Sequence, residues 1–209
     1  MRVLVACERS GVVREAFRAR GHVAYSCDVL PAIDGSAYHI MGDAMNALDP
    51  VWDLMIAHPP CTYLTIAAAW AFKDGPYHQR VKPGTLVGAA RRAARDASVD
   101  FFRALLDAPI ARVAIENPVG AISTLFRKPD QIVQPWQFGE DASKATCLWL
   151  KNLPLLRHTC VLPGGRTTRR ANQTASGQNR LGPSPTRAAE RAKTYQGIAD
   201  AMADQWGVL

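Results

Sequence analysis

Short apolar runs alternate with amphipathic stretches along the chain, and this alternation predicts an α/β fold. Four apolar runs favour strands, at residues 3–6, 22–28, 52–57 and 110–115. Residues 12–20 and 89–108 have apolar side chains at roughly helical spacing, and Gly21 ends the first of these helices. Strands and helices that alternate in short units are typical of a doubly wound, mostly parallel sheet.

The pattern weakens after residue 120, which indicates a short irregular region. Residues 146–150 form one more apolar run, which predicts a strand. Residues 163–186 are rich in Gly, Thr, Arg, Asn, Ser and Pro and therefore predict a loop. Residues 188–206 return to helical composition, with apolar side chains four apart on one face at Ile198, Met202 and Trp206.

Length and composition indicate one soluble domain. The 209 residues, 48% hydrophobic and 21% charged, suffice for a single α/β core with residues 121–186 as a small basic loop insertion, a candidate recognition region. No apolar run is long enough to cross a membrane and the N-terminus lacks a signal-peptide core, so we expect a cytoplasmic protein. The cysteine count is odd, at five, and no pair has CxxC spacing, so we expect neither a disulfide framework nor a bound metal.

The net charge of +7 is concentrated in one segment. Residues 157–193 contain eight basic residues and one acid, whereas the rest of the chain has 17 of each. Such a concentration indicates a surface that binds a polyanion. The alternative is a solvated basic loop. If the segment binds a substrate, its candidate contacts include Arg166, Arg169 and Arg170.

Candidate chemistry gathers at the predicted carboxyl ends of the strands, where ligands bind in doubly wound sheets. These positions are residues 7–11, Asp28, residues 58–61 and residues 116–118. Asp28 ends the second strand, where such folds use an acid to bind ribose hydroxyl groups.

Cys61 and Glu116 are the candidate catalytic pair. Two prolines precede Cys61 and fix the backbone, which presents the thiol with little freedom, as a nucleophile requires. Glu116 ends an apolar strand and is followed by Asn117-Pro118, so we expect partial burial to raise its pKa and let it share a proton. The alternatives are an incidental buried thiol and a capping carboxylate.

Four phrases of the sequence resemble cytosine C5 DNA methyltransferases, and most closely the short phage-type members of that family. They are Ala57-His-Pro-Pro-Cys-Thr-Tyr-Leu64, Ile115-Glu-Asn-Pro-Val-Gly120, Lys144-Ala-Thr-Cys-Leu-Trp-Leu150 and Gly197-Ile-Ala-Asp-Ala-Met-Ala-Asp-Gln-Trp206. The resemblance is strongest over residues 1–120 and returns near 178–206. It implies a Rossmann-like methyltransferase fold that uses S-adenosylmethionine.

The resemblance also implies a reaction. The Cys61 thiolate adds to C6 of cytosine, which makes C5 nucleophilic toward the methyl group of S-adenosylmethionine. Glu116 holds N3 and the exocyclic amine of the base. A target cytosine within duplex DNA has to leave the base stack to be attacked. A basic segment is then needed to bind the phosphates.

Further site residues follow from the resemblance. The expected cofactor contacts are Cys7, Glu8, Ser10, Gly11, Asp28, Asp43 and Pro59. The family's Gly-rich turn is reduced here to Gly11, and Asp43 resembles the residue that contacts the adenine amine. The expected substrate contacts are Pro60, Asn117, Pro118, Arg166, Arg169, Arg170, Gln178 and Arg180, where Gln178-Asn-Arg180 matches a Gln-x-Arg element near the target base.

Two other functions remain open from the sequence. The same chemistry on a single strand, RNA or a mononucleotide suits the small recognition region. A catalytically silent α/β protein that binds nucleic acid would keep the fold and the basic segment.

Overall fold

The computed structural model describes residues 1–66 and 68–209, and within them seven strands form one sheet in the order β3-β2-β1-β4-β5-β7-β6. The strands are β1 (Arg2–Ala6), β2 (Val23–Asp28), β3 (His39–Met41), β4 (Leu54–Ala57), β5 (Arg112–Pro118), β6 (Gln131–Val133) and β7 (Thr146–Lys151). β3, β2, β1, β4 and β5 pair in parallel, whereas β7 is antiparallel to both β5 and β6. The predicted mostly parallel sheet is therefore confirmed.

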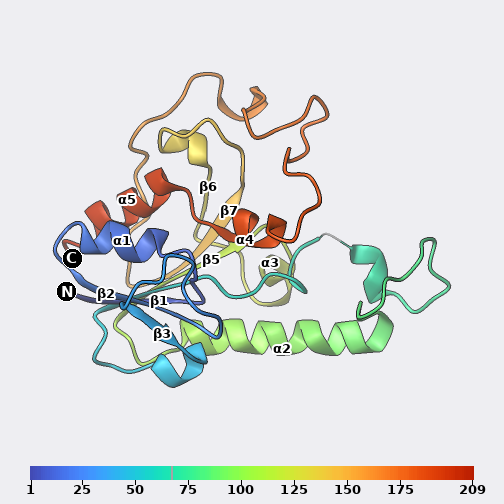
Figure 1. Ribbon diagram of the computed structural model, residues 1–209, viewed down its shortest axis with the longest axis horizontal. Coiled ribbons are helices and arrows are strands. Elements are labelled where there is room, and N and C mark those ends of the chain that lie inside the picture. Colours follow the sequence, from blue (N-terminus) through green and yellow to red (C-terminus); the bar gives the residue numbers. More distant parts are fainter. Residues whose placement is uncertain (67) are drawn as a thin grey trace.

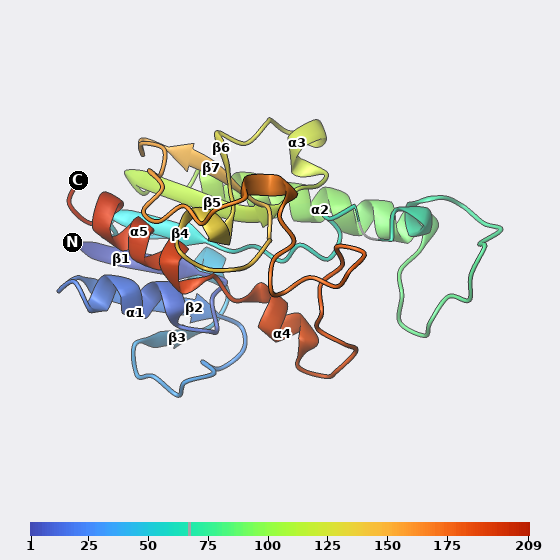
Figure 2. The same ribbon diagram turned by 90° about the horizontal axis from the view of Figure 1, so that it is seen from above.

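Helices cover both faces of this sheet, which makes it doubly wound as predicted (Figures 1 and 2). The α-helices are α1 (Val12–Arg18), α2 (Gly88–Leu106), α3 (Ile122–Leu125), α4 (Arg187–Ala192) and α5 (Gln196–Trp206). Short 3₁₀ turns occur at η1 (Ala44–Ala47), η2 (Ala69–Phe72), η3 (Pro135–Gln137) and η4 (Gly165–Thr167). α1 and α5 pack on one face and α2 packs on the other. No helix among the described residues is long and apolar enough to cross a membrane.

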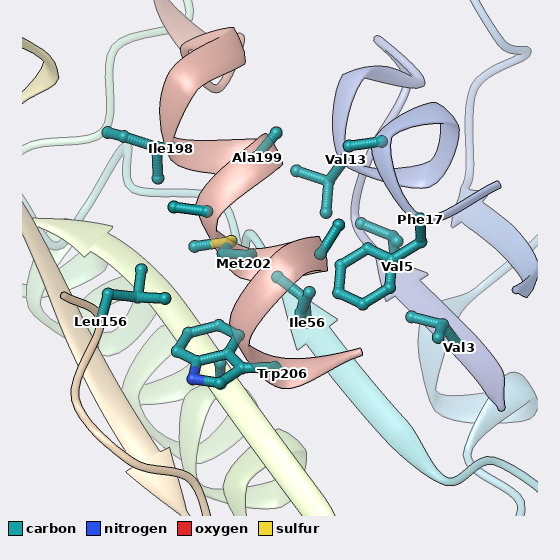
Figure 3. Packing of buried hydrophobic residues seen from close by; sticks show 14 of the residues in the cluster. Val3, Val5, Val13, Phe17, Ile56, Leu156, Ile198, Ala199, Met202 and Trp206 are labelled. Carbon is teal, nitrogen blue, oxygen red and sulfur yellow. The ribbon is translucent and has the colours of Figure 1, made fainter. Parts of the chain in front are cut away.

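β1 is buried on both faces of the sheet. Val3 and Val5 face the cluster under α1 and α5, whereas Leu4 and Ala6 face the cluster over α2. This explains why β1 reads as a continuous apolar run instead of an alternating one. Figure 3 shows the α1 and α5 side of the core, with side chains that include Phe17, Met202 and Trp206.

Residues 188–206, which have helical composition throughout, form most of two separate helices, α4 and α5. The break falls at residues 193–195, where Lys193 and Tyr195 have extended ψ angles of 135° and 140°. Tertiary contacts hold this break: Thr194 is buried, and the Lys193 carbonyl accepts a hydrogen bond from Lys144 Nζ at 3.1 Å. Helical composition alone does not reveal such a contact.

The short strands β3 and β6 were not predicted. β3 lies at the edge of the sheet, and its three residues are exposed or half-buried, so no alternation of buried and exposed positions marks the strand. β6 lies at the opposite edge, with Val133 as its fully buried residue. Edge strands of three residues leave little pattern for a sequence to reveal.

The strand order reverses between β1 and β4, and doubly wound sheets bind ligands in the crevice beyond the carboxyl ends of the strands at such a point. The chain after β1 contains residues 7–11, and the chain after β4 contains residues 58–61. Beyond this point residues 69–87 project from the body beside the N-terminal end of α2 (Figures 1 and 2). The fold thus brings the predicted cofactor turn and nucleophile to neighbouring strand ends.

Trp206 tests the packing of α5. Its side chain is fully buried, and its indole Nε1 donates to the Pro154 carbonyl at 3.0 Å. Because Trp206→Ala leaves a cavity and an unpaired carbonyl, we expect it to lower the free energy of unfolding by about 3–5 kcal/mol, measured in urea. Val208→Ala, at an 80% exposed position, should change it by less than about 0.5 kcal/mol. Equal effects would contradict the packing described.

Candidate active site

Cys61 is held by a short, rigid segment after β4. The backbone N–H of His58 donates to the Ala6 carbonyl at 2.9 Å, which extends the pairing with β1. Pro59 is buried and Pro60 is exposed. The Cys61 carbonyl then accepts hydrogen bonds from Leu64 and Thr65 at 3.0 and 3.1 Å, so a turn closes behind the thiol. Cys61 is half-buried, as suits a nucleophile that a substrate must reach.

Glu116 lies on the neighbouring strand β5, and its loop is tied to that of Cys61. The Asn117 amide Nδ2 donates to the Pro59 carbonyl at 2.9 Å, and the Ala121 N–H donates to the Leu64 carbonyl at 2.7 Å. A Cβ atom at Gly120 would overlap the Leu64 carbonyl oxygen, so this approach requires glycine. The structure thus brings the sequence-predicted pair, Cys61 and Glu116, to one edge of the sheet.

The Glu116 carboxylate is buried and has cationic or protonatable neighbours on both oxygens. His58 Nδ1 lies 3.3 Å from Oε2, and Lys144 Nζ lies 3.9 Å from Oε1. Neither residue was assigned a role from the sequence, although both occur within the phrases quoted above. Their positions in the chain could have indicated a place near Glu116, because His58 follows β4 and Lys144 precedes β7, the two strands that flank β5.

The predicted rise in the pKa of Glu116 is wrong. Burial alone would raise the pKa, but the positive charge of Lys144 and the hydrogen bond and charge of His58 outweigh it and lower the pKa to about 2. The carboxylate is therefore ionised in the resting protein. The sequence showed that Glu116 would be buried, but it did not show what would be buried beside it.

The pKa of the Cys61 thiol shifts in the opposite direction. Burial and the negative charge of Glu116 raise this pKa, whereas a backbone hydrogen bond and the positive charges of Lys144 and Arg191 lower it. The net rise keeps the thiol protonated in the resting protein. Other thiols are less suited to nucleophilic attack: burial and Asp28 raise the pKa of Cys7 to about 12, and burial and Glu116 raise that of Cys147 to about 11.

The turn after β1 is occupied by internal contacts. The buried Glu8 carboxylate accepts hydrogen bonds from the Ser10 hydroxyl at 3.1 Å and from the N–H groups of Val13 and Arg14 at 2.9 and 3.3 Å, so it caps α1. At Gly11, φ is 73°, and the space of a side chain is filled by the paired Arg14 and Asp34. Glu8 and Gly11 therefore have roles in the fold itself.

The ends of β2 and β3 provide two further acids. Asp28 accepts a hydrogen bond from the Leu30 N–H at 2.9 Å, and Asp43 accepts one from the Met45 N–H at 2.9 Å. The Gly42 N–H donates to the Asp28 carbonyl at 2.9 Å, which brings the two acids close together. Burial raises the pKa of Cys7, and the negative charges of both acids raise it further. Val29 and Leu30 are 67% and 49% exposed beside Asp28. An acid with apolar side chains next to it suits the ribose and the adenine of an adenosine group.

The basic segment 157–193 presents part of its charge to solvent. Arg166, Arg169 and Arg180 are exposed, as is Gln178 in a small hairpin. Arg170 is buried, pairs with Asp141, and donates to the carbonyls of residues 163 and 165 at 3.1 and 3.0 Å. Its guanidinium therefore holds the segment together from inside.

A second basic cluster lies outside that segment. Residues 68–95 contain six basic residues and one acid. The chain outside residues 157–193 has equal numbers of basic and acidic residues, so that total does not reveal this cluster. Lys73, Arg80 and Lys82 are exposed, and within the described residues no acidic group lies within 4.0 Å of them. This cluster includes the projection that follows Cys61 in the chain (Figure 2).

Glu116→Gln tests the electrostatic description of the site. A carboxyl whose pKa falls from 4.5 to about 2 on folding stabilises the protein above pH 4.5, and this stabilisation is lost as pH falls toward 2. This contribution to the free energy of unfolding is about 3 kcal/mol. We expect urea unfolding between pH 3 and 6 to show a weaker pH dependence in Glu116→Gln than in the native protein. The exposed Glu190→Gln is the control, and parallel curves for Glu116→Gln and the native protein would contradict the shift.

Comparisons with known proteins complete the description. No protein-family model and no curated protein matches the sequence. One solved structure that is similar is described as a DNA modification methyltransferase encoded within a prophage of E. coli, with 12% identity, a TM-score of 0.48 and 78% of this chain covered. Another is a mutant of Spodoptera frugiperda DNMT2, with 16% identity, a TM-score of 0.42 and 78% covered. This chain spans about half the length of each, 52% and 55% respectively.

Proposed function

We propose that this protein is a DNA cytosine C5 methyltransferase, with Cys61 as nucleophile and Glu116 as the residue that binds the base. The observation that carries the proposal is the junction of their two loops through Asn117, Pro59 and Gly120. A thiol and an ionised carboxylate on adjacent parallel strands can bind one small heterocycle between them. The quoted sequence phrases, which resemble that family, support the same assignment.

The charges of the site suggest how base binding activates the thiol. The Glu116 carboxylate raises the pKa of Cys61, so the thiol keeps its proton while the site is empty of base. When cytosine binds, one Glu116 oxygen accepts a hydrogen bond from the exocyclic amine, and the other faces N3. The thiol proton then passes to the pair formed by Glu116 and N3. This transfer removes the charge that opposed the thiolate.

The bond changes that follow need one further reactant, a water molecule from solvent that accepts the C5 proton. The Cys61 sulfur bonds to C6 as the C5–C6 double bond opens, and C5 gains electron density. S-adenosylmethionine supplies the methyl group and leaves as its thioether. A water molecule from solvent then takes the C5 proton, the electron pair of that C–H bond re-forms the C5–C6 double bond as the C6–sulfur bond breaks, and the proton on N3 returns to the Cys61 sulfur. Lys144 and His58 hold the Glu116 carboxylate in place throughout.

For the cofactor we propose the crevice between the ends of β1, β2 and β4. Asp28 has the chemistry to bind ribose hydroxyl groups, with Val29 and Leu30 against the adenine. Asp43 would accept a hydrogen bond from the adenine amine, and Pro59 would border the methyl group. Cys7, Ser10 and the backbone of Glu8 and Gly11 would line the methionine end, because the Glu8 side chain caps α1 and Arg14 and Asp34 fill the space beside Gly11.

For the nucleic acid we propose a surface made by the exposed groups of residues 157–193. Arg166, Arg169 and Arg180 would bind phosphates, with Gln178 beside them. Pro60, Asn117 and Pro118 would border the target base next to the catalytic pair, and a base taken from a duplex would be flipped out. Duplex DNA is preferred over a single strand, RNA or a mononucleotide because basic residues lie in two clusters, at 68–95 and 157–193.

Trapping tests the nucleophile. DNA that contains 5-fluorocytosine, together with S-adenosylmethionine, should give a covalent complex visible on a denaturing gel, because fluorine cannot leave C5 as the proton does. Cys61→Ser should abolish the complex while DNA binding survives. Cys160→Ser removes an exposed thiol and should trap as well as the native protein. Trapping by Cys61→Ser would overturn the assignment, and DNA binding without any trapping would favour the silent nucleic-acid-binding protein.

Charge reversal tests the nucleic-acid surface. Arg166→Glu with Arg169→Glu should weaken DNA binding and flatten its dependence on salt, because fewer counterions are released. A slope smaller by about two, one for each arginine, is expected. Arg103→Glu, which reverses the charge of one exposed arginine on α2, is the control and should leave the affinity unchanged. An unchanged affinity for the double variant would identify residues 157–193 as a solvated loop.

A further inference from the structure

Asn172 connects the basic segment to the chain just before β7. Its Oδ1 accepts a hydrogen bond from the Ser143 N–H at 2.9 Å, and its Nδ2 donates to the Ser143 carbonyl at 3.0 Å. The same Nδ2 donates to the Tyr195 hydroxyl at 3.2 Å. One side-chain amide therefore satisfies both backbone polar groups of a single residue 29 positions away.

Ser143 is followed directly by Lys144, the cation beside Glu116. Residues 142–145 have no regular secondary structure, so side-chain contacts fix their position. The Lys144 N–H donates to Gln134 Oε1 at 2.9 Å, and the Lys144 ammonium donates to the Lys193 carbonyl at 3.1 Å. From this position Nζ lies 3.9 Å from Glu116 Oε1. The placement of the cation thus depends on contacts made from the segment 157–193.

We propose that Asn172 is a positioning residue that couples the basic segment to the catalytic pair by holding Lys144 beside Glu116. The proposal rests on the proposed function for the chemistry of Cys61 and Glu116, but its geometry is independent of that chemistry. Asn172 contacts no reacting atom. It acts through the backbone of Ser143.

Asn172 also faces a surface hollow. The hollow has a volume of about 320 Å³ and is lined by Asn172, Asn179, Arg180, Leu181 and Tyr195. Arg180 and Tyr195 offer a charged and an aromatic contact to a nucleotide next to the target. Substrate that enters the hollow would touch the amide that fixes Ser143. Binding to the basic segment is thereby linked to the position of Lys144.

The Cys61 thiol reports the position of Lys144. The charged groups that act on Cys61 are Glu116 from β5, Lys144 before β7 and Arg191 from α4, with His58 in its own loop bonded to Glu116. The positive charge of Lys144 lowers the pKa of Cys61. If Lys144 moves away, this pKa rises and the thiolate fraction at a given pH falls.

Alkylation of Cys61 by iodoacetamide measures this effect in the full chain, without nucleic acid or methyl donor. The rate is followed by mass spectrometry of the peptide as a function of pH, with exposed Cys160 as an internal reference. Asn172→Ala should slow alkylation of Cys61 several-fold near neutral pH and move its profile to higher pH. Asn179→Ala, in the same hollow but without a bond to Ser143, should leave the profile unchanged.

A double-mutant cycle separates positioning from general loosening. Lys144→Met should shift the Cys61 profile in the same direction, and Asn172→Ala should add no further shift in its presence. Asn172→Leu, of similar size but without hydrogen bonds, serves as a second variant should Asn172→Ala fail to fold. No shift in the Asn172 variant, or a shift that adds to that of Lys144→Met, overturns the proposal. Because no methyl transfer is measured, the result stands apart from the proposed function.

Discussion

The close contact between the loops after β4 and β5 is the constraint on which the candidate site depends. Parallel pairing of these strands brings their carboxyl ends together, but it does not fix the loops beyond them. The hydrogen bond from Asn117 to Pro59 and the approach of Gly120 to Leu64 supply that restraint. Cys61 and Glu116 are thus placed by contacts between their loops before any substrate arrives, which is the condition for a preorganised site.

The charges of the site determine the protonation states of Glu116 and Cys61. The site contains one buried carboxylate, held ionised by Lys144 and His58, and one thiol whose proton that carboxylate stabilises. In a buried environment such charges interact strongly, so a ligand that neutralises Glu116 also changes the state of Cys61. Lys144 in turn depends on contacts from residues 157–193. In the proposed mechanism, polyanion binding is therefore linked to activation of the thiol through the hydrogen bonds of Asn172 and Lys144 and the ion pair between Lys144 and Glu116.

The sequence predicts which residues follow each strand, but it does not predict the contacts between residues that are distant in the chain. Cys61 and Glu116 could be placed because each follows an apolar run, and carboxyl ends of parallel strands converge. Lys144 could not, because its proximity to Glu116 arises from the antiparallel pairing of β7 with β5. The break at Lys193 and the burial of Arg170 likewise depend on partners distant in the chain. The sequence shows how many charged side chains there are, but only the fold shows which of them form ion pairs.

Transfer of a labelled methyl group tests the central claim most directly. The protein is incubated with S-adenosylmethionine labelled in its methyl group and with duplex DNA, single-stranded DNA, RNA or a cytosine mononucleotide. The product bases are then identified by mass spectrometry. The structure and its charges predict label in 5-methylcytosine, greatest with duplex DNA. Label on another atom, or no transfer to any of these substrates, would contradict the assignment of Cys61 and Glu116 as a C5 methyltransferase pair.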